Sequence, residues 1–195
     1  MQFQALPVST HPLVLLRPIA ASDLGDWLDY LTLPVVYEHT SWATTSTTEL
    51  APYVWSAEIA APSAALRLAI ADRASGRLVG TMGFHTVSAQ NRSAELAYDL
   101  APQVWGKGIA TQLCNTLVAW AHSDAGLLRV QATTLESNLR SARVLQRCGF
   151  VHEGLLRSYR MVRGTPGNFN LFAHVHPMPA DPDTQRPGQV PSPAL

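Results

Sequence analysis

Charged side chains are scarce in this sequence of 195 residues, and the two signs of charge cancel. Lys+Arg and Asp+Glu number 14 each, which gives 14% charged residues and a net charge of zero, against about 25% charged residues in a typical soluble domain. Because there is no excess of positive charge, nothing in the composition favours direct binding to nucleic acid or to an anionic membrane surface. Any anion that the chain binds must be held by a local arrangement of groups.

Cysteines and long apolar runs are also few. Cys114 and Cys148 lie in segments predicted to be helical, without the spacing of a metal site or the density of a disulfide framework. We therefore expect two reduced thiols and no metal. No apolar run reaches the length of a membrane span, and the N-terminus lacks a basic stretch followed by an apolar core. These absences predict a cytoplasmic protein that has no membrane partner.

The length of the chain suits one domain with a full hydrophobic core. Residues 177–195 hold six of the 14 prolines and almost no large apolar side chain, so this segment cannot bury a core and is predicted to be a disordered tail. We expect an N-terminal extension at residues 1–12 and a folded domain at residues 13–176.

Helical periodicity dominates the first third of the chain after a short strand at "PLVLLRPI". "SDLGDWLDYL" predicts a helix capped by Ser22, and "STTELAPYVWSAEIAA" predicts a second helix capped by Thr47 or Thr48, with Pro52 in its first turns. The alternation of residues 66–85 around the turn "RASGR" then predicts a β-hairpin.

The remaining segments alternate between strand and helix. "RSAELAYDL" and "LLRVQATTL" are predicted strands, each followed by a predicted helix, and Gly126 and Gly149 suit the ends of these helices. "VHEGLLRSYRMV" and "FNLFAHVH" predict a closing strand pair. This order predicts a single α/β (α+β) domain with a mixed central sheet.

The stretch "PQVWGKGIATQL" places two glycines, Gly106 and Gly108, directly before a helix. Small residues and the free N–H groups of a helix start allow a phosphate to approach the backbone. The spacing does not fit the dinucleotide fingerprint, because the third small residue, Ala110, comes one position too early. It does not fit a Walker loop either, because Lys107 is followed by glycine. Taken alone, the pattern is equally that of a flexible turn before an ordinary helix.

A second motif follows in "ESNLRSARVLQRCGF", where Asn138 begins a helix, Ser141 lies three residues later and Gly149 ends it. Together with "RSAELAYDLAPQVWGKGIAT", this resembles the GNAT acetyltransferase superfamily, and more narrowly the branch of the ribosomal-protein N-terminal acetyltransferases. The resemblance implies a GNAT fold with a mostly antiparallel sheet and a splayed parallel strand pair. It also implies acetyl-CoA as co-substrate, bound mainly by main-chain groups.

The resemblance assigns parts of the cofactor to residues of this sequence. The pyrophosphate would lie on the loop, the pantetheine arm would pair with the backbone of the first splayed strand, and Asn138 would bond the cofactor near the acetyl group. The implied cofactor-binding residues are Tyr98, Asp99, Leu100, Trp105, Gly106, Lys107, Gly108, Ile109, Ala110, Thr111, Asn138 and Ser141.

The implied reaction is direct attack of an amine on the thioester. An ammonium group must first lose a proton, and the developing oxyanion needs a backbone N–H, expected near residues 96–98. Many members of the superfamily carry a tyrosine acid seven residues after the asparagine, where this chain has Leu145. In the narrower branch a serine takes that role, which implies Ser141 as the acid, although its hydroxyl could instead bond the helix backbone.

The base could be Glu95, Asp99 or His85. Strand alternation places Glu95 and Asp99 on one face and the leucines on the other. Glu95 is our choice, although a salt-bridged carboxylate would give the same pattern. His174 and His176 lack a third ligand and are not interpreted as a metal site.

The sequence leaves the acceptor open. The favoured acceptor is a protein N-terminus, and the alternatives are a small-molecule amine or a non-catalytic module that binds acyl-CoA. Either a monomer or a homodimer is compatible with the sequence.

Overall fold

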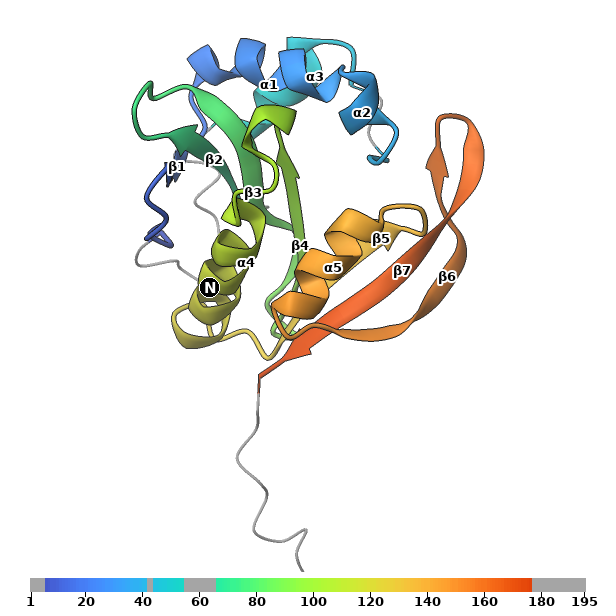
Figure 1. Ribbon diagram of the computed structural model, residues 1–195. Coiled ribbons are helices and arrows are strands. Elements are labelled where there is room, and N and C mark those ends of the chain that lie inside the picture. Colours follow the sequence, from blue (N-terminus) through green and yellow to red (C-terminus); the bar gives the residue numbers. More distant parts are fainter. Residues whose placement is uncertain (1–5, 42–43, 55–65, 177–195) are drawn as a thin grey trace, which may run out of the picture.

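The computed structural model describes residues 6–41, 44–54 and 66–176 (Figure 1). The tail predicted at 177–195 and the second half of the helix predicted after Thr48 lie outside the described residues.

A seven-stranded mixed sheet forms the centre of the domain, in the order β1-β2-β3-β4-β5-β7-β6. Every neighbouring pair is antiparallel except β4 and β5, which run parallel. The strands are β1 Val14–Pro18, β2 Leu66–Asp72, β3 Leu78–Ser88, β4 Ser93–Leu100, β5 Arg129–Leu135, β6 Val151–Val162 and β7 Thr165–Val175. The predicted mixed sheet and its parallel pair are confirmed.

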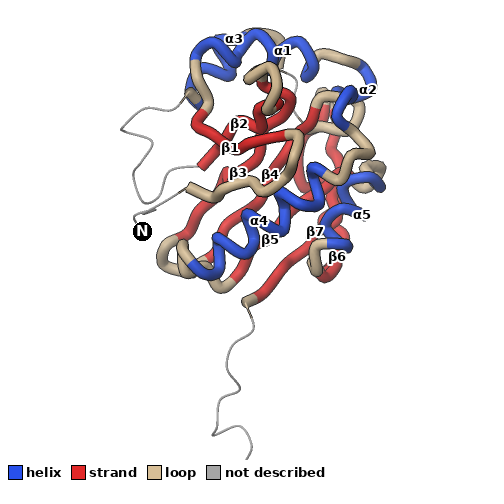
Figure 2. Tube along the Cα trace, turned by 60° about the vertical axis from the view of Figure 1, so that its left-hand side comes forward, coloured by secondary structure: helices blue, strands red, loops and turns tan. Residues whose placement is uncertain are grey.

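Two groups of helices cover the sheet. The longer helices α4 and α5 lie against one face, and the three short helices gather at one end of the molecule (Figures 1 and 2). The helices are α1 Leu24–Leu31, α2 Pro34–Tyr37, α3 Thr47–Leu50, α4 Ile109–Ser123 and α5 Leu139–Arg147. The short α2 was not predicted from the sequence.

The predicted caps of the N-terminal helices were wrong by a residue or more. A 3-10 turn at Ala21–Asp23 precedes α1, and Asp23 rather than Ser22 accepts a bond from the Ala20 N–H, at 2.8 Å. The buried Asp23 carboxylate is also held by Arg17, an ion pair that the helical pattern does not reveal. Ser46, not Thr47 or Thr48, caps α3, because its hydroxyl accepts from the Thr48 N–H at 3.1 Å.

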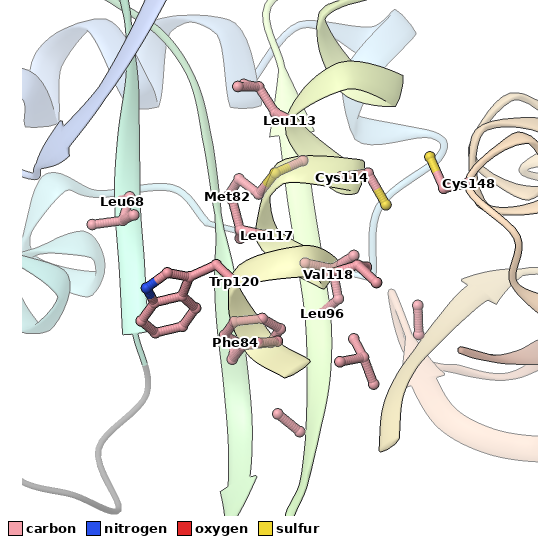
Figure 3. Close-up of a cluster of buried hydrophobic side chains, with 14 of the residues drawn as sticks. Leu68, Met82, Phe84, Leu96, Leu113, Cys114, Leu117, Val118, Trp120 and Cys148 are labelled. Atoms are coloured by element: carbon pink, nitrogen blue, oxygen red, sulfur yellow. The ribbon is translucent and has the colours of Figure 1, made fainter. Parts of the chain in front are cut away.

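The main core lies between α4 and the sheet. Leu113 and Leu117 of α4 pack in one cluster with Met82, Phe84 and Leu96 of β3 and β4 (Figure 3). A second cluster, which includes Trp27, Leu50 and Ala69, joins the short helices to the opposite face of the sheet. The sheet is therefore packed on both faces around β2 and β3, whereas β6 is largely exposed.

Gly83 in β3 leads to a prediction about the β2–β3 pair. A Cβ atom at Gly83 would lie 1.8 Å from the carbonyl oxygen of Leu66 on β2, so Gly83→Ala must push the strands apart. We expect the free energy of unfolding to fall by about 1–3 kcal/mol or more, measured by urea titration.

Gly25→Ala is the matched control, because Gly25 is an exposed helical residue whose added Cβ would meet nothing within 4 Å. This control should gain about 0.5–1 kcal/mol. A Gly83→Ala protein as stable as wild type would contradict the close approach of β2 and β3.

Candidate functional site

The site begins where β4 and β5 separate. The parallel ladder joins Ser93–Glu95 to Arg129–Gln131 and then stops, although both strands continue for several residues. A cavity of about 1130 Å³ opens beyond this point and is lined by the later residues of both strands, the start of α4 and one side of α5. The predicted splayed strand pair is therefore present.

The glycine loop forms one wall of the cavity. Gly106 and Gly108 have φ of 74° and 77°, left-handed values that favour glycine. All of residues 105–111 line the cavity except Lys107, whose side chain is exposed. The first four N–H groups of an α-helix have no acceptor within the helix, and here Gln112 is the first donor that bonds back, to the Gly108 carbonyl at 3.0 Å. Gly108 and the first turn of α4 therefore offer backbone donors to an anion.

Asn138 and Ser141 face this loop across the cavity. Asn138 caps α5, because its side-chain oxygen accepts from the Ser141 N–H at 3.1 Å and its amide nitrogen donates to the His39 carbonyl at 3.1 Å. The Tyr98 hydroxyl donates to the Ser141 carbonyl at 3.4 Å, and burial raises the pKa of Tyr98. Asn138 thus fixes the start of α5 and its link to the loop after α2.

Asp99 is held in a buried network on the other face of β4. Its carboxylate bonds Arg67 and Tyr30 and accepts from the Thr81 hydroxyl at 2.8 Å. Burial, followed by the charge of Asp99, raises the pKa of Tyr30. The carboxylate of Asp99 is neutralised by Arg67, so Asp99 reaches the cavity as a paired group.

Glu95 lies on the same face and is 4% exposed. Its Oε1 atom accepts from Thr133 Oγ1 at 2.7 Å and from Arg160 Nη2 at 3.0 Å, and lies 3.3 Å from His85 Nε2. Burial opposes the charge of Glu95, but hydrogen bonds from His85 and Thr133 and the charge of Arg160 lower its pKa to about 2. Glu95 is thus an ionised group surrounded by donors.

His85 faces Glu95 because of a β-bulge. The β3–β4 register pairs Phe84 with Leu96 and Thr86 with Glu95, so His85 is the extra residue. Bulges turn side chains away from simple alternation, and the sequence prediction, which ended the hairpin at residue 85, did not include it. His85, Thr133 and Arg160 line the cavity around Glu95.

A family model described as an acetyltransferase (GNAT) domain matches residues 14–151 of the chain. The chain belongs to the GNAT acetyltransferase family. The resemblance seen in the two motifs is confirmed.

Relatives of this GNAT chain include enzymes of the predicted branch. The chain is 36% identical over 112 residues to an uncharacterized N-acetyltransferase, YoaA, of Bacillus subtilis, covering 57% of this chain and 63% of that protein. It is 28% identical over 98 residues to the ribosomal-protein-serine acetyltransferase of Escherichia coli, covering 50% of this chain and 55% of that protein. The matched part thus spans about 55–63% of the length of these relatives.

Solved structures share the GNAT fold over nearly their whole length. The S5-alanine acetyltransferase of Vibrio fischeri superposes with a TM-score of 0.73 at 20% identity, covering 86% of this chain and 96% of that chain. The Vibrio cholerae spermidine N-acetyltransferase, solved with CoA and spermine, has a TM-score of 0.72 at 21% identity, covering 85% and 96%.

Three arginines of the GNAT cleft were missed from the sequence. Arg140, Arg143 and Arg147 recur on one side of α5 and line the cavity, and the Arg140 guanidinium lies 4.8 Å from the centre of the Trp105 ring. Their spacing of three and four residues is the signal that could have revealed them. The cleft thus holds basic side chains as well as backbone donors.

The hairpin of β6 and β7 closes the far end of the cleft. Arg163 at its tip donates to the carbonyls of Tyr37 and Thr40 at 3.0 and 2.9 Å, and the tip lies beside α2 in Figure 1. Long-range contacts of this kind leave no local pattern in the sequence. Among the described residues, no cluster of three His, Cys, Asp or Glu side chains could hold a metal ion, and none of the helices there is long and apolar enough to span a membrane.

Glu95 gives a prediction about stability and pH. Its pKa is about 2 in the fold against 4.5 ordinarily, so its contribution is fully present above about pH 4.5 and is lost as the pH falls towards 2. Glu95→Gln should lower the free energy of unfolding by about 2 kcal/mol at pH 7, and the deficit should shrink at pH 3.

The control is Glu153→Gln, which breaks the exposed pair of Glu153 with Arg129 and should cost less than about 1 kcal/mol. If Glu95→Gln lowers the free energy of unfolding by the same amount at pH 7 and pH 3, the charge of Glu95 is not what stabilises the site. Urea titrations at the two pH values measure both variants.

Proposed function

We propose that this protein is an acetyl-CoA-dependent N-acetyltransferase that transfers the acetyl group to a primary amine, with a protein N-terminus as the favoured acceptor. The separation of β4 and β5, with the glycine loop at one side and Asn138 and Ser141 at the other, carries the proposal. Ribosomal-protein acetyltransferases among the relatives and fold neighbours support the acceptor.

The cofactor would lie along the cleft. The N–H groups of the loop and the first turn of α4 suit the pyrophosphate, as does the positive end of the helix dipole. The arginines of α5 suit the remaining phosphate. The pantetheine arm would pair with the backbone of Tyr98, Asp99 and Leu100, where β4 has lost its neighbour β5.

The charges near the acetyl end favour an acceptor with a single amine. Among the described lining residues, Asp99 is the one carboxylate, and Arg67 neutralises it. Glu95 behind the lining is likewise paired with Arg160. A polyamine carries further ammonium groups that need acidic partners, since unpaired charges are costly to desolvate. A peptide N-terminus brings one amine followed by amide groups, which suit the nearby hydroxyls of Thr40, Ser41 and Thr86.

We propose that His85 accepts the proton of the attacking amine. Glu95 is too weak a base at a pKa of about 2, but its charge stabilises an imidazolium beside it. If the Nε2–H of neutral His85 donates to Glu95, the lone pair is on Nδ1. The Nδ1 atom lies 3.0 Å from Thr86 Oγ1. The proton can reach Nδ1 directly, through one water or through that hydroxyl. Glu95, our first choice from the sequence, then acts through His85.

The tetrahedral intermediate needs donors at the splayed strand. The last residue pair of the β4–β5 ladder is Glu95 with Gln131. Beyond this pair, the backbone N–H groups of residues 96–98 that point towards β5 suit the developing oxyanion. Ser141, which lines the cavity, is proposed to protonate the departing thiolate, a weak base with a pKa near that of cysteine, about 8.5.

The acceptor can be tested by release of CoA thiol from acetyl-CoA. Peptides with a free N-terminal amine should give kcat/KM at least about tenfold above that of spermidine, a difference of about 1.4 kcal/mol. The same peptides with a blocked N-terminus serve as controls and should be inert. Faster acetylation of spermidine than of every peptide would assign the acceptor to polyamines, and tight CoA binding without turnover of any amine would contradict an enzyme.

The proton path can be tested by the rates of two variants. His85→Asn should lower kcat by about a hundredfold or more, because the proposed base is removed. Glu95→Gln should lower kcat less, because His85 remains and loses only the charge beside it. Loss of activity in Glu95→Gln with normal activity in His85→Asn would show that Glu95, and not His85, is the general base. Normal kcat in Ser141→Ala would remove Ser141 as the acid.

A further inference from the structure

His11 joins the N-terminal segment to the glycine loop. Its Nε2 atom lies 3.2 Å from the carbonyl oxygen of Lys107, and its Nδ1 atom accepts from the Leu13 N–H at 3.2 Å. The residue is 6% exposed, so the imidazole itself is largely shielded from solvent. His11 is separated from Lys107 by 96 positions in the sequence, and no motif pointed to it.

The two partners fix the form of the imidazole. A backbone N–H can only donate, so Nδ1 must carry the lone pair towards Leu13. The proton of a neutral imidazole then lies on Nε2, where the Lys107 carbonyl accepts it. The ring is thus a donor aimed at the loop, with its orientation set by Leu13.

Holding the Lys107 carbonyl also orients the next N–H. The chain has no cis peptide bond in its described part, and in a planar trans peptide the carbonyl of one residue and the N–H of the next point in opposite directions. Gly108 lines the cavity, whereas Lys107 does not. The bond from His11 pulls the Lys107 carbonyl towards the N-terminal segment, so the Gly108 N–H is turned the opposite way.

We propose that His11 is a positioning residue for acetyl-CoA, which presets the Lys107–Gly108 peptide so that the Gly108 N–H meets the pyrophosphate. The flanking glycines make this presetting necessary. Gly106 and Gly108 have open space where a Cβ would lie, so neither side-chain packing nor a rigid φ holds the peptide between them. A donor that fixes the peptide before binding lowers the entropy that the ligand must remove.

The segment that carries His11 is itself anchored. Arg73 donates to the carbonyls of His11 and Ser9, both at 3.0 Å, and the Ser9 hydroxyl donates to the Val14 carbonyl at 3.0 Å. The Gln112 side chain, one turn into α4, donates to Thr10 Oγ1 at 2.8 Å. Residues 9–11 are thus tied both to the β2–β3 turn and to α4, which gives His11 a fixed base.

The inference rests on the proposed function, because it assumes the pyrophosphate at this loop. Two variants separate the contacts of His11. His11→Asn keeps an oxygen near the Nδ1 position for the Leu13 N–H but does not reach Lys107, whereas His11→Gln brings an amide N–H near the Nε2 position. His11→Asn should raise the Kd for CoA and the KM for acetyl-CoA by about three- to tenfold, with kcat changed less than about twofold. His11→Gln should recover most of this loss.

A second acetyl donor, S-acetylpantetheine, is used for comparison because it lacks the pyrophosphate. Its kcat/KM should be the same in wild type and His11→Asn, which a general loss of structure would not allow. Glu153→Gln is the control: it breaks the exposed ion pair of Glu153 with Arg129, away from the N-terminal segment and the glycine loop, and should leave the KM for acetyl-CoA unchanged.

Wild-type affinity for CoA in His11→Asn, or equal losses with both donors, would overturn the role of His11 while leaving the proposed function in place. A wild-type protein that binds no CoA would overturn the proposed function, and the role of His11 with it.

Discussion

The early end of the ladder between β4 and β5 is the constraint on which the site depends. A parallel pair normally continues as long as both strands do, because unpaired backbone groups inside a protein are costly. Here the pair stops after Glu95, and the cavity opens beside strand residues whose N–H and C=O groups face it. A ligand that pairs like a strand completes those bonds. The glycine loop and the start of α5 line the same cavity, so the splayed strands and these two elements border one opening.

Charge pairing on the opposite face of β4 occupies the carboxylates of this strand. Both carboxylates of the strand are used internally: Glu95 with Arg160, and Asp99 with Arg67. Each pair also ties β4 to a strand outside the splayed pair, which stabilises the arrangement around the opening. The carboxylates of β4 are thus balanced by charges of the protein itself, while the arginines of α5 line the other part of the cleft.

The strands and the glycine loop could be predicted from the sequence because their signals are local. Alternation, turn residues and two glycines before a helix lie within short windows, and the asparagine of α5 lies at the start of its own helix. The surroundings of Glu95 were not accessible in this way. The bulge that turns His85, and the approach of Arg160 from β6, depend on how distant strands pair. The caps of α1 and α3 were misplaced because several polar residues compete at those positions, and the ion pair of Asp23 with Arg17 decides one of them.

The most direct test of the account is an NMR titration of the labelled protein with CoA. If the cleft between β4 and β5 is the cofactor site, the amide resonances of Gly106, Gly108 and residues 109–111 should shift together, followed by those of residues 96–100. Saturable binding that shifts amides elsewhere and leaves the glycine loop unchanged would contradict the account.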